Sequence, residues 1–115
     1  MADTLKILGQ LEGSTSQAVL YTVPEGAQTT ISCIYVCRKA ATNGSYKIAV
    51  RKNGAGTSPA TVTDDQWIAY DTSIWANTTA QIGAGITLND NDDIVVYSLD
   101  TDVVFSCYGV ETTED

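Results

Sequence analysis

Hydrophobic and polar residues alternate along this chain in short runs. β-branched and aromatic stretches are separated by clusters of Gly, Asn, Asp, Ser and Thr, and no segment with helical periodicity extends beyond two turns. This pattern is typical of all-β domains. It predicts strands at residues 5–10, 18–23, 29–39, 45–52, 65–72, 79–88, 93–99 and 104–111. We therefore expect an all-β fold, a single antiparallel β-sandwich of jelly-roll-like form with about eight strands.

The polar clusters between these runs contain recognisable turn signals. Asn43-Gly44 stands between two apolar alternations, and this dipeptide predicts a β-hairpin that joins strands 29–39 and 45–52. One domain is expected over residues 1–115, with a frayed acidic tail at residues 111–115. Further turns or exposed loops are expected at residues 24–26, 51–65, 89–93 and 99–102.

The charge of the chain is strongly acidic and unevenly distributed. Six Lys and Arg stand against 14 Asp and Glu, which gives a formal net charge of −8. Such a charge disfavours nucleic acid and anionic membranes as partners. Five of the basic residues nevertheless fall between positions 38 and 52, namely Arg38, Lys39, Lys47, Arg51 and Lys52. They predict either a solvated hairpin or a basic patch that meets an acidic neighbour, such as another copy of the chain.

Two further absences in the sequence bear on where the protein works. No apolar run approaches the ~20 residues that a membrane span needs. The first residues show no basic segment followed by an apolar one, so no secretory signal is recognised. We therefore expect synthesis in a cytoplasm and no membrane partner.

Catalytic and metal chemistry find little support in the residues. The chain has no histidine, which removes the commonest general base and the commonest transition-metal ligand. Most aspartates fall in predicted turns, where Asp is favoured for backbone reasons. Residues 89–93 resemble the start of a calcium loop, but Ile94 stands where such a loop requires Gly. We expect no catalytic residues, no metal site and no cofactor.

The three cysteines are expected to be reduced thiols that act as small apolar side chains. On a strand, Cys33 and Cys37 face the same side with Cα atoms about 13 Å apart, because each residue rises about 3.3 Å. That separation excludes a disulfide between them and a shared tetrahedral zinc on an unbroken strand. A bond from Cys107 to either one stays open, because it depends on which strands adjoin.

The aromatic residues offer a second candidate for interaction. Trp67, Tyr70 and Trp75 fall within nine residues of one another. Packing inside the fold is the default for such side chains. Two alternatives stay open: burial of Trp67 and Trp75 in a protein interface, and a sugar-binding platform.

The order of motifs along the chain resembles a known family. The segments that carry the resemblance are LYTVPEG (20–26), VCRKA (36–40), YKIAVRKNG (46–54), WIAYDTSIWANTTAQIGAGITLNDNDDIVVYS (67–98) and VFSCYGVE (104–111). Together they resemble small virion proteins of tailed phages, especially phages that infect cyanobacteria and other aquatic bacteria. The likeness lies in the order and spacing of these segments. One departure is Arg38, which stands where the family pattern has Asn.

The resemblance implies a role on the virion, without catalysis. It implies a β-sandwich subunit that acts as a capsid decoration (cement) protein, binds the outer surface of the major capsid protein shell and stabilises it. Such proteins act as homo-oligomers, commonly trimers, so a homotrimer on the capsid surface is expected. Two alternatives stay open: a structural protein of the tail, neck or baseplate, and a receptor- or glycan-binding module of a tail fibre.

Overall fold

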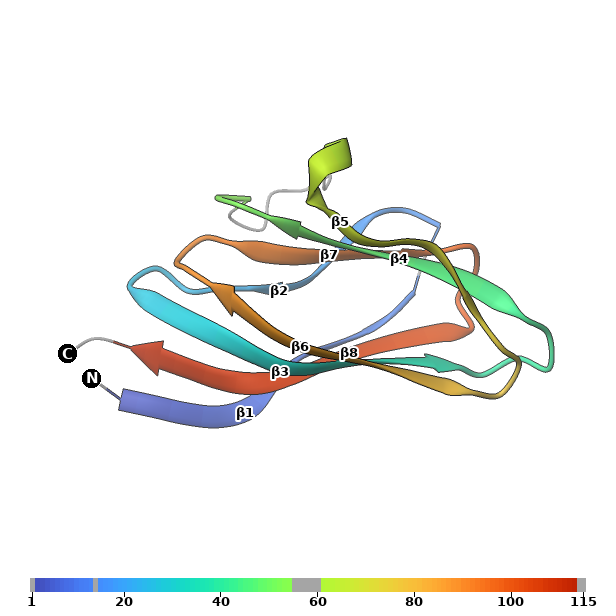
Figure 1. Ribbon diagram of the computed structural model, residues 1–115, viewed down its shortest axis with the longest axis horizontal. Coiled ribbons are helices and arrows are strands. Elements are labelled where there is room, and N and C mark those ends of the chain that lie inside the picture. Colours follow the sequence, from blue (N-terminus) through green and yellow to red (C-terminus); the bar gives the residue numbers. More distant parts are fainter. Residues whose placement is uncertain (1, 14, 55–60, 114–115) are drawn as a thin grey trace.

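The strands of the computed structural model closely follow the alternation of the sequence. The structure describes residues 2–13, 15–54 and 61–113, and Figure 1 shows how they are arranged. The elements are β1 (Ala2–Glu12), β2 (Ala18–Thr22), β3 (Ala27–Arg38), β4 (Gly44–Arg51), the 3₁₀ turn η1 (Asp64–Gln66), β5 (Trp67–Ile74), β6 (Thr79–Leu88), β7 (Asp93–Ser98) and β8 (Val103–Thr113). Within these described ranges, no helix has the length and apolar character needed to cross a membrane.

The eight strands form two four-stranded antiparallel sheets. Sheet A has the order β1-β8-β3-β6, and sheet B has the order β2-β7-β4-β5. Consecutive strands alternate between the sheets except for β4 and β5, and this connectivity is that of an eight-stranded jelly roll. In Figure 1 the two sheets lie as two layers, with sheet B above and sheet A below. The predicted antiparallel, jelly-roll-like β-sandwich is confirmed.

The hairpin predicted at Asn43-Gly44 is wrong. β3 belongs to sheet A and pairs with β6 and β8, whereas β4 belongs to sheet B and pairs with β5 and β7. The chain does reverse here, but it passes from one layer to the other. The Asn43 side chain stabilises this crossing, because its Oδ1 accepts a hydrogen bond from the backbone N–H of Ala76 at 2.9 Å.

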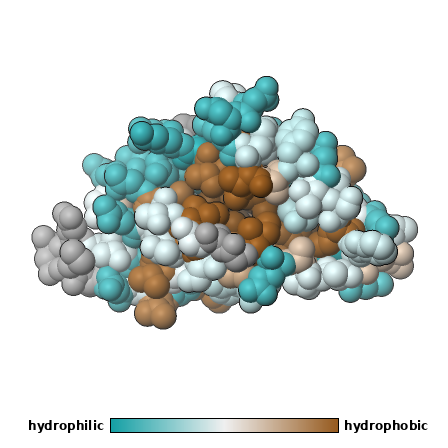
Figure 2. All heavy atoms as spheres, in the orientation of Figure 1, coloured by the Kyte–Doolittle hydropathy of each residue, from teal (hydrophilic) through white to brown (hydrophobic). Residues whose placement is uncertain are grey.

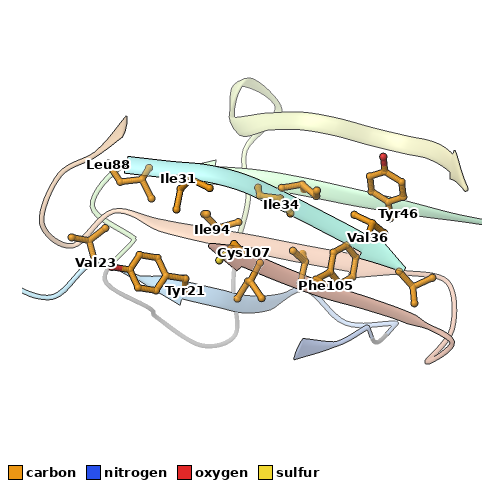
Figure 3. Close-up of a cluster of buried hydrophobic side chains, with 14 of the residues drawn as sticks. Tyr21, Val23, Ile31, Ile34, Val36, Tyr46, Leu88, Ile94, Phe105 and Cys107 are labelled. Atoms are coloured by element: carbon orange, nitrogen blue, oxygen red, sulfur yellow. The ribbon is translucent and has the colours of Figure 1, made fainter. Parts of the chain in front are cut away.

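The core lies between the sheets and is built from the inward positions of the strands. Figure 3 shows Tyr21, Ile34, Ile94 and Phe105 pointing into this space from β2, β3, β7 and β8. Burial alternates with period two along β3 and β8, as expected for strands with one buried face. Tyr46 and Phe105 meet edge to face across the core, with ring centroids 6.3 Å apart.

The two long sides of the sandwich differ. On one side β1 lies close to β2, and Gly9 permits this approach because a Cβ there would collide with the Leu20 carbonyl oxygen. On the other side lie the edge strands β5 and β6, whose residues Ala69, Ile82 and Ile86 are only partly buried against the core. Figure 2 shows apolar atoms gathered in the middle of the visible face, with hydrophilic side chains around them.

The frayed tail expected from residue 111 is wrong for residues 111–113. β8 continues to Thr113, and Glu111 pairs with Thr4 of β1 and with Thr29 of β3. The Glu111 side chain is buried and bonded, as described below, which holds the end of the strand in place. Residues 114 and 115 lie outside the described residues.

Candidate interaction surfaces

Arg38, at the end of β3, forms a structural ion pair in which its own side chain is buried and that of Asp100 is half-exposed. Its Nη1 donates to Oδ1 of Asp100 at 2.6 Å, and its Nε donates to the Thr42 carbonyl at 2.9 Å. The hydrogen bond from Arg38 is the main reason why the pKa of Asp100 lies below its usual value. Arg38 thus ties the β3–β4 crossing to the turn after β7. A side chain used in this way is not available to a partner.

Arg51, at the end of β4, is buried on the outer face of sheet B. Its Nε and Nη2 donate to the two carboxylate oxygens of Asp93 at 2.8 and 2.6 Å, and its Nη1 donates to the Thr61 carbonyl at 3.4 Å. Asp93 is fully buried. This bidentate pair joins the ends of the neighbouring strands β4 and β7, and the bond to Thr61 ties the residues before η1 to it.

A second apolar cluster lies beneath that segment. Ala49 and Val95 point outward from sheet B, yet both are fully buried, because Val19, Val62 and Trp67 pack against them. Val62 belongs to the loop predicted at residues 51–65, and it is half-buried, unlike its exposed neighbours. Residues of the chain itself therefore cover Ala49 and Val95 on the outer face of sheet B.

The predicted basic patch is wrong as a single surface, because Arg38 and Arg51 are buried. The other three basic residues do not form a cluster. Lys39 pairs with Glu12 at 3.2 Å on the surface, Lys47 is enclosed by aromatic rings, and Lys52 is exposed in the turn after β4.

Lys47, Trp67, Tyr70 and Tyr97 form a lysine–aromatic cluster on sheet B. The Lys47 Nζ lies 4.2 Å from the ring centroid of Tyr70, 5.0 Å from that of Tyr97 and 5.6 Å from that of Trp67. Trp67 and Tyr70 meet edge to face, with centroids 5.3 Å apart. These are favourable cation–π distances. Trp67 is therefore mainly occupied by contacts inside the fold.

Trp75 has the opposite environment. It follows β5 and is 71% exposed. Ile68 and Tyr70 on β5 are also exposed, and β6 adds the half-buried Ile82 and Ile86. We call Ile68, Ile82 and Ile86, on the two edge strands, the β5–β6 side. Of the two predicted tryptophans, only Trp75 presents most of its surface to solvent.

The outer face of sheet A carries apolar residues among polar ones such as Gln10, Ser106 and Gln81, and no described segment covers it. The side chains of Ile31, Ile34, Phe105 and Cys107 point into the core, so their neighbours along β3 and β8 point outward. With the matching positions of β1, the outward apolar residues are Leu5, Ile7, Cys33, Tyr35, Cys37, Val104, Tyr108 and Val110. Leu5 is 80% exposed and Ile7 is 55% exposed.

The cysteines occupy both faces of sheet A. Cys33 and Cys37 lie on the outer face, as the sequence predicted for a shared side of one strand, whereas Cys107 lies in the core. All three are free. The sheet separates Cys107 from the other two, which answers the open question of its pairing. Burial raises the pKa of Cys107 to about 11, so this thiol is unreactive at neutral pH.

A buried polar network at the end of β8 was missed by the sequence analysis. The Tyr21 hydroxyl donates to Oε2 of Glu111 at 2.6 Å and lies 2.7 Å from Oγ1 of Thr29, while Lys6 Nζ donates to Oε1 of Glu111 at 3.1 Å. Burial and the Glu111 carboxylate raise the pKa of Tyr21. The hydrogen bond from Tyr21 lowers the pKa of Glu111.

The acidic segment 89–93 forms the turn between β6 and β7, as predicted. The Asp92 carboxylate accepts hydrogen bonds from the backbone N–H groups of Asn53 and Asn89 at 3.0 and 2.9 Å. Asn91 has a φ of 65°, which suits a tight turn. The Asp92 carboxylate therefore has a structural role in this turn. In the described part of the chain, no three Cys, Asp or Glu side chains are grouped as metal ligands.

Comparison with known proteins found no matching family model, no matching curated protein and no matching solved structure.

Proposed function

We propose that this chain is a non-enzymatic structural protein of a phage virion, a capsid decoration protein that binds the outside of the major capsid protein shell and stabilises it. In this role it works on the capsid surface as a homo-oligomer, for which the family resemblance implies a trimer. The proposal joins that resemblance to the surfaces of the jelly roll.

The observation that carries the proposal is the apolar β5–β6 side. Ile68 is exposed on an edge strand, and the half-buried Ile82 and Ile86 lie on the edge strand of the other sheet. An apolar surface with a hydrophilic surround, as in Figure 2, is typical of a protein-binding site. Free strand edges add backbone donors and acceptors for a partner chain.

The charged groups support the same interpretation. Arg38, Arg51, Asp93 and Glu111 are buried and bonded within the fold. These contacts within the fold stabilise the sandwich. A rigid body with apolar contact surfaces suits a protein that reinforces a shell, because many weak contacts repeated over a lattice add up to strong binding.

The direct test is a cryo-EM map of the virion that contains this protein. We expect density for the jelly roll at repeated positions on the icosahedral shell. Density confined to the tail, neck or baseplate would contradict decoration and favour the alternative structural role.

A binding experiment tests the surface itself. Ile68→Lys places a charge on the β5–β6 side and should weaken binding of the purified chain to capsid shells that lack it. Leu99→Lys is the matched control, because Leu99 is also an exposed apolar residue but lies in the β7–β8 turn. Equal loss of binding in the two variants would contradict the assignment of this side.

The glycan-binding alternative rests on one observation, the exposed ring of Trp75. A glycan array tests it with the wild-type chain and Trp75→Ala. We expect no specific glycan signal. A signal that disappears in Trp75→Ala would overturn the decoration role in favour of a receptor-binding module.

A further inference from the structure

We propose that the outer face of sheet A is a self-association surface, which packs against the same face of a second copy of this chain. The inference rests on the proposed function only in that both require an oligomer. It assigns a surface and a symmetry that the resemblance does not provide.

The centre of the face carries an apolar patch, with the polar residues Gln10, Ser106 and Gln81 in the row beside it. Leu5 and Ile7 of β1 stand opposite Val110 and Tyr108 of β8, and Tyr108 stands opposite Cys33 of β3. Tyr35 and Tyr108 meet edge to face with centroids 5.6 Å apart. The two rings bridge β3 and β8, so the apolar surface extends from the edge strand to the middle of the sheet.

The charges of the sheet identify the occupant. Arg38 and Glu111 are the only charged residues in β3, β6 and β8, and both side chains are buried. Asp3 and Glu12 lie near the two ends of β1, where Asp3 stands opposite Thr112 and Glu12 opposite Val104. The centre of the face therefore carries no charge, although the whole chain has a net charge of −8. Two such chains repel each other, and an uncharged face lets them meet with the least repulsion.

The area of the face sets the expected strength of the self-association. Four strands about 4.8 Å apart and four rows of outward side chains about 6.8 Å apart give an area of about 500 Å². Two faces in contact bury about 1,000 Å², which is the lower end of specific interfaces. We therefore infer a weak dimer whose population rises with the concentration of the chain. Two sheet faces can pack in this way with their strands aligned or crossed.

Like faces in contact form an isologous interface, which closes at two copies. The pair therefore differs from the trimer that the resemblance implies. The two states have different masses, so one measurement separates them.

The test is light scattering of the purified chain from micromolar to millimolar concentration. We expect the mass to rise from that of one chain, 12.2 kDa, towards twice that value. Added salt should shift the rise to lower concentration, because it screens the repulsion between two acidic chains. A constant monomer mass, a limiting mass of three chains, or dissociation by salt would overturn the proposal.

Two matched variants locate the surface. Ile7→Lys changes a 55% exposed isoleucine on sheet A and should keep the chain monomeric, whereas Ile68→Lys changes a 49% exposed isoleucine on sheet B and should leave the pair intact. Circular dichroism confirms that each variant is folded before its mass is measured by light scattering. The reverse result would contradict the proposed face.

This experiment contains no capsid, so its outcome is separate from the proposed function. Shell binding with no pairing would leave the decoration role standing and overturn this inference. Pairing with no shell binding would do the opposite.

Discussion

The outer faces of the two sheets differ in whether residues of the chain itself cover them. On sheet B, Thr61 and Val62 lie against the outer face, where Arg51 donates to the Thr61 carbonyl and Val62 packs against the buried Ala49 and Val95. On sheet A, the described residues include no such segment, and Leu5 and Ile7 remain exposed. A β-sandwich can thus cover one outer face with its own chain and leave the other for a partner.

The anchor of the covered face should give the largest effect. Asp93→Ala leaves the Arg51 guanidinium buried without its carboxylate, and we expect a loss of about 3–5 kcal/mol in the free energy of unfolding. Urea denaturation measures it. Glu12→Ala, which breaks the exposed pair with Lys39, should change stability by less than about 1 kcal/mol. Equal losses would show that the Arg51–Asp93 pair is no special anchor.

Valines on the two faces allow a matched comparison. Val95 on sheet B is fully buried, so Val95→Ala should cost about 2 kcal/mol of unfolding free energy through lost burial. Val110 on sheet A is only half-buried, so Val110→Ala should cost less than about 1 kcal/mol in the dilute chain. If Val110→Ala is the more damaging of the two, the description of the faces is wrong.

The lysine–aromatic cluster on sheet B makes a smaller contribution to the free energy of unfolding. Lys47→Ala should lower the free energy of unfolding by about 1–2 kcal/mol, because the ammonium lies over three rings and is mostly shielded from solvent. Lys47→Arg keeps the cation and should recover most of that loss. Lys52→Ala, in an exposed turn, should change little. A shift in Trp67 fluorescence in Lys47→Ala alone would support the contact.

Beneath the uncovered sheet, Glu111 gives stability a dependence on pH. The hydrogen bond from Tyr21 lowers its pKa from the ordinary value of 4.5, so the folded chain binds this proton less readily than the unfolded chain. This stabilisation is complete well above pH 4.5 and is lost as pH falls through the lower folded-state pKa.

Urea midpoints over this range test the assignment. The midpoint of the wild-type chain should fall on acidification, and Glu111→Gln should show a shallower fall because its amide does not titrate. Asp100→Asn is the control, since the pKa of Asp100 is lowered by Arg38 at a different place. An unchanged slope in Glu111→Gln would remove Glu111 as a cause.

The strands could be predicted from the sequence because alternation is a local signal. The segment predicted at 79–88 coincides with β6, and the one at 93–99 differs from β7 by one residue. The pairing of strands could not be predicted in the same way. Asn43-Gly44 signals a reversal of the chain, and in a jelly roll that reversal passes between sheets.

The roles of the charged residues could not be predicted, because their partners are distant in sequence. Arg38 bonds Asp100 across 62 positions, and Arg51 bonds Asp93 across 42. Glu111 bonds Tyr21 across 90 positions. This contact cannot be seen in the sequence, so a frayed tail was predicted where the strand in fact continues. A surface assignment from composition alone therefore failed for the arginines. Trp75, next to a turn, is exposed, and its role in an interface stays a prediction.

The most direct test of the difference between the two faces uses the native cysteines. Alkylation followed by mass spectrometry reports Cys37 on the outer face of sheet A, with Cys107 in the core as internal control. We expect Cys37 to react readily in dilute chain and to become protected as concentration rises, while Cys107 stays unreactive throughout. A Cys37 rate that is independent of concentration, in samples where light scattering detects pairs, would contradict the claim that a second copy covers this face.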